Sequence, residues 1–288
     1  YTVMATAEEL RNADPQDLVR KLQDLANHPQ IICYYGPSSK DDITRLVSKT
    51  HKVRKRAKHP DVWSMPTLGD RYPQLPTPQN EVYIAPYESK AVKLIMYSNN
   101  GQKYDPALDG DIILFNEYFG GSMNAIVFQE LREARGLAYS AGANYARPGY
   151  RGGFNTFSAN IGSQNDKMGD CLDVFHEIIE HMPVAQNCFD LAKDAVIKRM
   201  NTDRTVAEAY LRYYISLRRM RFDHDPDIDI YNKVKGMTLD DLVQFSKQNV
   251  AGRTYKFIVL GDESNLDMKK LESLGTIHRL TLEDIFGY

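Results

Sequence analysis

Apolar and polar residues between positions 124 and 145 change their spacing halfway along the segment. Apolar side chains recur at helical spacing from Ile126 to Leu131, whereas residues 138–145 alternate small and aromatic side chains as a strand does. Gly136 lies between the two patterns, and glycine can leave a helix with positive φ at little cost. We therefore predict a helix, a glycine corner and a strand.

Two polar residues flank this predicted corner. Arg132 ends the helical pattern and Tyr139, seven residues later, begins the strand. A guanidinium and a phenol can both donate hydrogen bonds to a carbonyl or an oxyanion, so the pair is a candidate functional site. The alternative is structural: Arg132 pairs with Glu130 or Glu133 on a solvated face, and Tyr139 packs in a sheet.

The remaining patterns predict an α+β fold, a mostly antiparallel sheet with helices packed on it. Strands are expected at residues 81–84, 92–97, 154–161 and 257–261, and helices at residues 105–118, 166–181, 186–201 and 206–219 and from Thr238 onward.

An internal repeat divides the chain. The helix start at Asp14-Pro15 recurs 224 residues later at Thr238-Leu239, and the strand pattern Ile31–Gly36 recurs 225 residues later at Phe257–Gly261. A further helical stretch follows each strand, although such a pair can also recur by chance. We predict that residues 1–50 are the tail of a preceding similar unit and that residues 81–288 form one complete unit.

Residues 51–80 separate these two parts. Five Lys and Arg residues lie between His51 and His59, and prolines at high density follow. Proline at this density predicts a linker. No aromatic residues interleave the basic run, so a solvated linker is favoured over a nucleic-acid surface.

Composition narrows the classes of function. The chain has 288 residues, a formal net charge of -2 and three cysteines. Near-neutrality argues against nucleic-acid binding, and no apolar run approaches the roughly 18 residues that span a bilayer. An odd number of cysteines argues against a disulfide framework. Because Tyr1 is not a translation start, we expect a processed product or a part of a longer protein.

The strongest metal-like motif is His176-Glu177-Ile178-Ile179-Glu180-His181. Zinc peptidases use two histidines four residues apart, as in H-E-x-x-H or H-x-x-E-H, so that both imidazoles leave one helical face. Here the histidines are five apart, which turns them roughly 140° from each other on a helix. We expect two surface histidines and no metal ligand in this chain.

A second metal-like pattern is the alternation of aspartates from Asp223 to Asp229. A calcium loop counted from Asp223 needs glycine at its sixth position and glutamate at its twelfth, but Ile228 and Val234 stand there. We therefore expect a solvated loop between helices.

Gly120, Gly121 and Ser122 form a third candidate. Such a turn can bind an anion at the start of the next helix. It is also explained as a helix break with Ser122 as the N-cap of the following helix.

Three motifs carry a resemblance to a known family: Phe119-Gly120-Gly121-Ser122, Phe128-Gln129-Glu130-Leu131-Arg132-Glu133 and Arg135-Gly136-Leu137-Ala138-Tyr139-Ser140. Together they resemble the hallmark of the non-catalytic domains of the M16 zinc peptidases. That family includes pitrilysin, insulin-degrading enzyme, the mitochondrial processing peptidases and the presequence proteases. The similarity is specific over residues 112–145 and continues in register from about 81 to 262.

The resemblance implies the C-terminal, substrate-enclosing part of a zinc metalloendopeptidase, which would not be catalytic in isolation. It implies that Arg132 and Tyr139 reach a zinc site on an N-terminal half, in the same chain or in a separate subunit. Zinc would belong to the complete protein and not to this chain. Gly120, Gly121 and Ser122 would lie near the peptide substrate, and large bacterial members suggest a periplasmic location.

Some M16 relatives have lost the zinc site and serve as partner subunits or scaffolds. A non-catalytic role therefore stays open from the sequence, as do the cleaved peptides and the oligomeric state.

Overall fold

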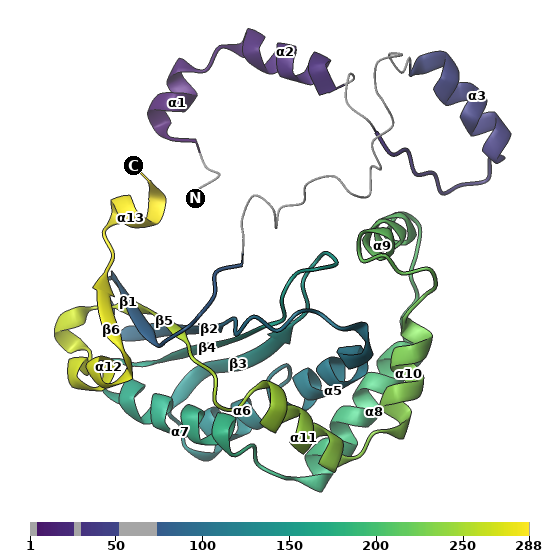
Figure 1. Ribbon diagram of the computed structural model, residues 1–288. Helices are drawn as coiled ribbons and strands as arrows, with labels where there is room; N and C mark the ends of the chain where they lie inside the picture. Colours follow the sequence, from purple (N-terminus) through teal and green to yellow (C-terminus); the bar gives the residue numbers. More distant parts are fainter. Residues whose placement is uncertain (1–4, 26–29, 52–73, 288) are drawn as a thin grey trace.

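The computed structural model describes residues 5–25, 30–51 and 74–287. From residue 81 onward the chain forms one sheet with a layer of helices packed against one of its faces (Figure 1). The prediction of an α+β unit is therefore confirmed. None of the described helices combines the length and the apolar composition needed to cross a lipid bilayer.

The described sheet has six strands in the order β3, β4, β2, β5, β1, β6. The pairs β3–β4, β4–β2 and β2–β5 are antiparallel, whereas β5–β1 and β1–β6 are parallel. The mostly antiparallel sheet was thus predicted correctly. The strand bounds are β1 (Glu81–Pro86), β2 (Ala91–Ser98), β3 (Ala138–Ala146), β4 (Thr156–Gln164), β5 (Lys256–Gly261) and β6 (Thr276–Arg279).

The helices of this unit mostly follow the apolar patterns of the sequence. A single 3-10 turn, η2 (Pro106–Leu108), leads into the first of them, as the Asp105-Pro106 start predicted. The bounds are α5 (Asp109–Phe119), α6 (Ile126–Phe128), α7 (Met168–Glu180), α8 (Gln186–Thr202), α9 (Glu208–Arg219), α10 (Asp227–Gly236), α11 (Leu239–Asn249), α12 (Met268–Leu274) and α13 (Leu282–Phe286).

Alternation along β2 explains why helices cover only one sheet face. Val92 and Leu94 are buried, whereas Lys93 and Ile95 between and after them are exposed. Leu94 lies opposite buried residues on both neighbouring strands, so the buried positions form one continuous apolar face. Burying that face against the helices provides most of the driving force for folding.

The central helix of the layer is α5. Its apolar residues are buried nearly all round, and Phe115 stacks on Phe119 with ring centroids 5.0 Å apart. Phe115 also contacts Phe245 of α11 at 5.2 Å. Such aromatic pairs stabilise a core beyond the area that they bury. In this unit α5 is therefore held both by its helix neighbours and by the sheet.

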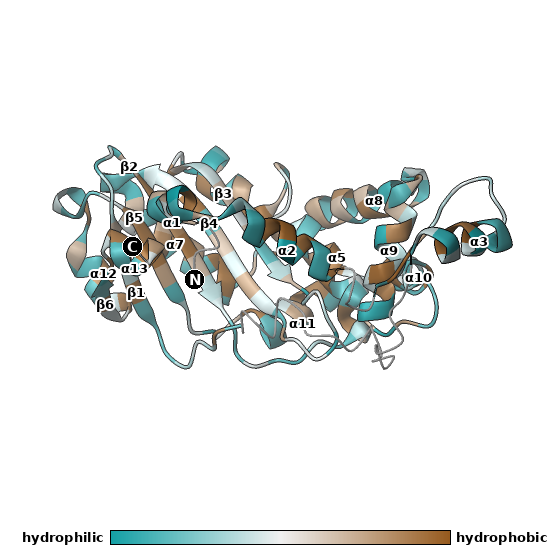
Figure 2. Cartoon of the chain, turned by 90° about the horizontal axis from the view of Figure 1, so that it is seen from above, coloured by the Kyte–Doolittle hydropathy of each residue, from teal (hydrophilic) through white to brown (hydrophobic). Residues whose placement is uncertain are grey.

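The N-terminal segment differs from this unit. The helices α1 (Ala7–Asn12), α2 (Pro15–Leu25) and α3 (Lys40–Thr50) have no buried residues, and Figure 2 shows hydrophobic stretches along α2. The predicted strand Ile31–Gly36 is wrong, because these residues form no strand and are mostly exposed. A strand needs a neighbour to satisfy its backbone, and none of the described residues supplies one here.

Three further differences have local causes. The second predicted strand of the hairpin is shifted to Thr156–Gln164, because the turn before it is longer than its glycines suggested. The acidic loop is only partly a loop, since Asp227 and Asp229 occupy the first turn of α10. β6 was missed because its four residues carry little apolar pattern. The predicted linker 51–80 lies largely outside the described residues.

The end of α5 meets β3 through backbone atoms. Ala143 N donates to Gly120 O over 3.3 Å, and the Asn116 side chain bonds both the N and the O of Tyr145, at 2.7 and 2.9 Å. A Cβ atom added to Gly120 would overlap the backbone oxygen and nitrogen of Ala143. Glycine is therefore required at this position by space and not by its φ of -142°.

We expect Gly120→Ala to lower the free energy of unfolding by about 1–3 kcal/mol, because the methyl group would push α5 away from β3. Urea unfolding followed by circular dichroism measures the change. Gly149→Ala is the matched control, since a Cβ there meets nothing within 4 Å. Equal stability of the two variants would contradict the role given to Gly120.

Candidate functional site

Arg132 lies on an irregular helix. After the single α-helical turn of α6, residues Gln129–Ala134 form a π-helical segment, η3, which carries Arg132 outward and buries Leu131. The Arg132 guanidinium carbon lies 4.9 Å from the centre of the Phe128 ring, and its Nε lies 3.6 Å from Glu133 Oε1. The side chain remains 48% exposed. An ion pair at this distance and exposure contributes little, so the cation remains accessible to a ligand.

The glycine corner formed as predicted. Gly136 has a φ of +57°, and the amides of Gly136 and Leu137 donate to the carbonyls of Arg132 and Leu131 over 3.0 and 2.9 Å. Ser163 Oγ of β4 donates to Leu137 O over 2.7 Å. The direction in which the chain leaves the helix is thus fixed by bonds to both the helix and the sheet.

Tyr139 follows the corner at a bulge in the β3–β4 pairing. The register shifts between Ala138 and Ser140, so that Tyr139 is the extra residue. Its ring lies across Gly162 of β4, where a Cβ would come within 2.5 Å of the phenol carbon Cζ. The side chain is 51% exposed, and its hydroxyl has no hydrogen-bond partner among the described residues. Gly162, which makes room for this ring, was not identified from the sequence because its requirement comes from another strand.

The corner therefore places two half-exposed donors on the two elements that meet at Gly136. Within residues 74–287 no hydrogen bond or ring contact joins Arg132 to Tyr139. Neither side chain is neutralised by the other, so both keep hydrogen bonds to offer. The prediction that they meet on one ligand is not tested by this arrangement.

The second predicted site begins at the end of α5. Gly120 is used by the contact with β3, and Gly121 N donates to Asn116 O over 2.7 Å, which continues the helix end. Ser122 is not the N-cap of the next helix, as predicted; Ala125 is, without a side-chain bond, because the turn from residue 120 to 125 is longer than the motif suggested. Contact with a substrate remains a prediction for these three residues.

The histidine motif behaves as its spacing predicted. His176 lies in α7 and His181 caps its end, and both are exposed. Across the described part of the chain, no group of three or more His, Cys, Asp or Glu side chains could hold a metal ion. Zinc therefore does not fit the residues that the structure describes, and no catalytic step can be assigned to a metal held by them.

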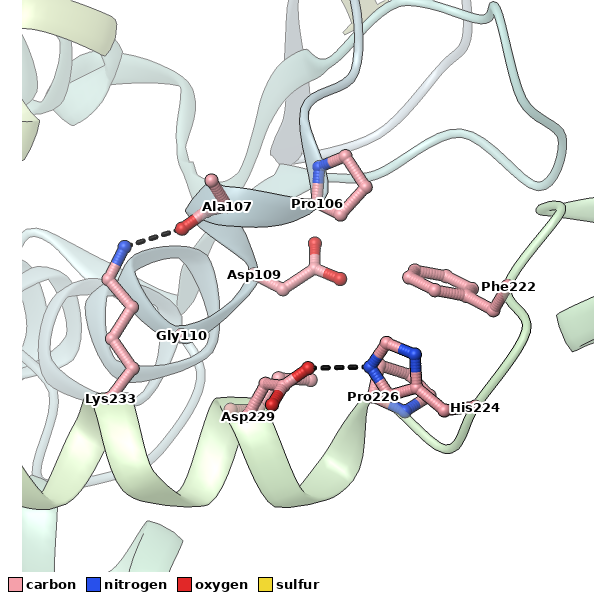
Figure 3. Close-up of a pocket in the computed structure, with 10 residues that line it drawn as sticks. Pro106, Ala107, Asp109, Gly110, Phe222, His224, Pro226, Asp229 and Lys233 are labelled. Atoms are coloured by element: carbon pink, nitrogen blue, oxygen red, sulfur yellow. Dashed lines mark hydrogen bonds and ion pairs between the residues drawn. The ribbon is translucent and has the colours of Figure 1, made fainter.

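A cavity that the sequence did not indicate lies between η2 and the start of α10 (Figure 3). Its volume is about 270 Å³, and Asp109 and His224 line it from opposite elements. Burial raises the pKa of Asp109, while hydrogen bonds from His224 to Asp223 and Asp229 raise the pKa of that histidine. The only sequence signal was the run of aspartates that had suggested calcium.

Comparison with known proteins follows the same division between fold and chemistry. No curated protein matches the chain in sequence. Among solved structures, a conserved protein from Enterococcus faecalis V583 is 15% identical with a TM-score of 0.66, and covers 90% of this chain and 58% of its own. A protease from Helicobacter pylori is 11% identical with a TM-score of 0.62, at 89% and 61% coverage.

A third structure, a peptidase M16 inactive domain from Pseudomonas fluorescens, is 16% identical with a TM-score of 0.55, and covers 66% of this chain and 45% of its own. At these identities the likeness concerns the fold alone. The chain spans about half the length of the solved structures that it matches.

The family model for the peptidase M16 inactive domain matches residues 30–194, which include the three motifs around the glycine corner. This match confirms the resemblance found in the sequence. Because the matched residues make up more than half of the chain, the chain belongs to the family of peptidase M16 inactive domains.

Proposed function

We propose that this chain is the C-terminal, substrate-enclosing part of an M16-type zinc metalloendopeptidase, in which a separate zinc-binding half cleaves the peptide. Arg132 and Tyr139 hold the substrate backbone or the charge that develops at the scissile carbonyl. Membership in the family of inactive domains and the lack of a metal-holding group among the described residues both support this division of labour.

The observation that carries the proposal is the pair of backbone irregularities at the corner. Arg132 lies on a π-helical segment and Tyr139 lies at a β-bulge. Such irregularities interrupt regular hydrogen bonding and are frequent at functional sites, where they redirect a side chain. Two of them within eight residues, each at a residue singled out by the sequence, favour a functional role over surface packing.

The chemistry follows from what the two side chains can donate. The guanidinium offers planar N–H groups, and the phenol offers one O–H. The Phe128 ring and the space above Gly162 hold them in place without using these donors. Fixed donors directed at an oxygen stabilise negative charge with little reorganisation. When bound on its own half, zinc would supply the activation of water, while this chain would bind and orient the peptide.

We expect Arg132→Ala or Tyr139→Phe, in the protein that includes the zinc-binding half, to lower kcat by about 10² to 10³ while zinc content stays unchanged. Peptide cleavage assays and elemental analysis measure the two quantities. Tyr87→Phe is the matched control, because Tyr87 is also an exposed tyrosine of the sheet unit.

Unaltered turnover in both variants would reject the assignment and favour the alternative, a non-catalytic scaffold or partner subunit. That alternative is supported by the same lack of a metal-holding group among the described residues. Robust peptide cleavage by this chain alone would reject both functions.

We also propose that residues 1–50 are the closing part of a preceding unit of the same fold. The repeat places four exposed apolar residues of this segment on four buried residues of the main unit: Leu18 on Leu242, Ile32 on Phe257, Tyr34 on Val259, and Leu46 on Leu271. Side chains that are buried in one copy and exposed in the other indicate a missing neighbour. The segment 31–36 would become a strand between the counterparts of β1 and β2.

The coverage of the structural matches supports this second proposal. Residues 52–288 make up about 82% of the chain, whereas two of the matches cover 90% and 89% of it. Their common fold therefore extends into residues 1–51, in chains that are longer than this one.

We expect Leu46→Asp to lower the stability of the longer protein by about 2 kcal/mol or more, because it would place a charge where a leucine is buried. In this chain alone it should change little. Leu10→Asp is the control, since Leu10 is exposed but lies before the repeat. Thermal unfolding of both proteins measures the effect, and a similar small effect of the two substitutions in the longer protein would contradict the proposal.

A further inference from the structure

Asp109 is a buried carboxylate with one oxygen left unpaired. The residue is 2% exposed at the start of α5. Its Oδ2 accepts hydrogen bonds from Tyr104 Oη at 2.8 Å and from Arg147 Nη1 at 3.0 Å. Its Oδ1 has no partner among the described residues. Leaving a buried acceptor unpaired costs about 1–3 kcal/mol, so a retained one needs a physical reason.

The carboxylate points into the cavity between η2 and α10. Figure 3 shows Asp109 directed toward the space that Pro106, Phe222 and Asp229 border. The Phe222 ring forms one wall, and the Asp229 carboxylate, bonded to His224 Nε2 at 2.6 Å, lies across from it. The cavity thus combines an aromatic wall with two carboxylates.

The nearby cation is already used. Lys233 lines the cavity with its aliphatic stem, but its Nζ donates to Ala107 O and to Asp111, at the far side of η2 (Figure 3). Arg147 binds the other oxygen of Asp109. No cation among the described residues therefore completes the unpaired oxygen.

The electrostatics of the helix ends account for only part of this arrangement. Asp109 and Asp229 lie in the first turns of α5 and α10, where acids offset the positive helix end. That explains why acids occur here, but not why an oxygen is left unpaired at a cavity. The described residues provide no three-ligand metal group, and two carboxylates would repel an anion.

We propose that this cavity binds an organic cation, namely the guanidinium or ammonium end of an arginine or lysine side chain. Such an end donates N–H groups to Asp109 Oδ1 and to the Asp229 carboxylate while its charge lies against the Phe222 ring. A guanidinium suits the site better than an ammonium, because it is planar, more weakly hydrated and able to bond two carboxylates at once. The cavity volume of about 270 Å³ accommodates one side-chain end.

The inference goes beyond the proposed function and does not depend on it, because it uses neither Arg132 nor Tyr139. The test is a calorimetric titration of this chain with N-acetyl-arginine methylamide. The matched ligand is N-acetyl-citrulline methylamide, which has nearly the same shape without the charge. Methylguanidinium and an arginine-containing pentapeptide form two further arms, which distinguish a free cation from a peptide side chain as the source.

We expect binding of the arginine compound, at least tenfold weaker binding of the citrulline compound, and at least tenfold weaker arginine binding by Asp109→Asn. Asp240→Asn, an exposed acid on α11, is the control that removes the same charge elsewhere. Tighter binding of the pentapeptide than of methylguanidinium would assign the site to a peptide side chain, and equal binding would assign it to free cations.

No binding by the unaltered chain, or equal binding of the arginine and citrulline compounds, would overturn the proposal. Asp109→Asn also removes the partner of Arg147, so its thermal unfolding is measured alongside. If that variant does not fold, Phe222→Leu and Asp229→Asn decide instead. Both should weaken arginine binding severalfold, and unchanged binding by both would reject the site.

Discussion

The close packing of α5 against β3 is the constraint on which the rest of the unit depends. β3 is an edge strand with a single strand neighbour, β4, and the Asn116 side chain and Gly120 O hold it from the helix side. The short segment between α5 and β3 must then cross from the helix layer to this edge. A regular helix joined to a regular strand would not meet both anchors, and the π-helical segment and the bulge absorb the difference. The corner residues therefore owe their positions to a contact that neither of them makes.

This dependence explains which parts of the corner could be predicted. The change from helical to strand spacing and the glycine between them are local features, so residues 126–145 were assigned correctly. The π-helical segment and the bulge were not foreseen, because they arise from the fit between two distant anchors. Gly162 was missed for the same reason, since the ring that needs its space comes from the neighbouring strand. The residues of a site can thus be found from local sequence, while their geometry depends on tertiary packing.

The errors elsewhere have the same physical origin. Ile31–Gly36 has the apolar pattern of a strand, but a pattern states what a segment can bury and not whether a neighbour is present to bury it. The matching pattern at Phe257–Gly261 forms β5, because β1 and β2 lie on either side of it. The acids after Phe222 were assigned to a loop because proline and aspartate favour turns. The same two residue types also favour the first turn of a helix, and here α10 begins within the run.

The helix α5 also relates the corner to the cavity at Asp109. Its eleven residues separate Asp109 from Gly120 by roughly 16 Å at the usual helical rise. The stacking of Phe115 on Phe119 and the contact with Phe245 bury the length between them, so the helix moves as one body or not at all. A cation bound at Asp109 could alter the corner only by displacing α5 against this packing, since close-packed cores resist continuous deformation. The two sites should therefore bind their ligands independently, each positioned by its own end of the same helix.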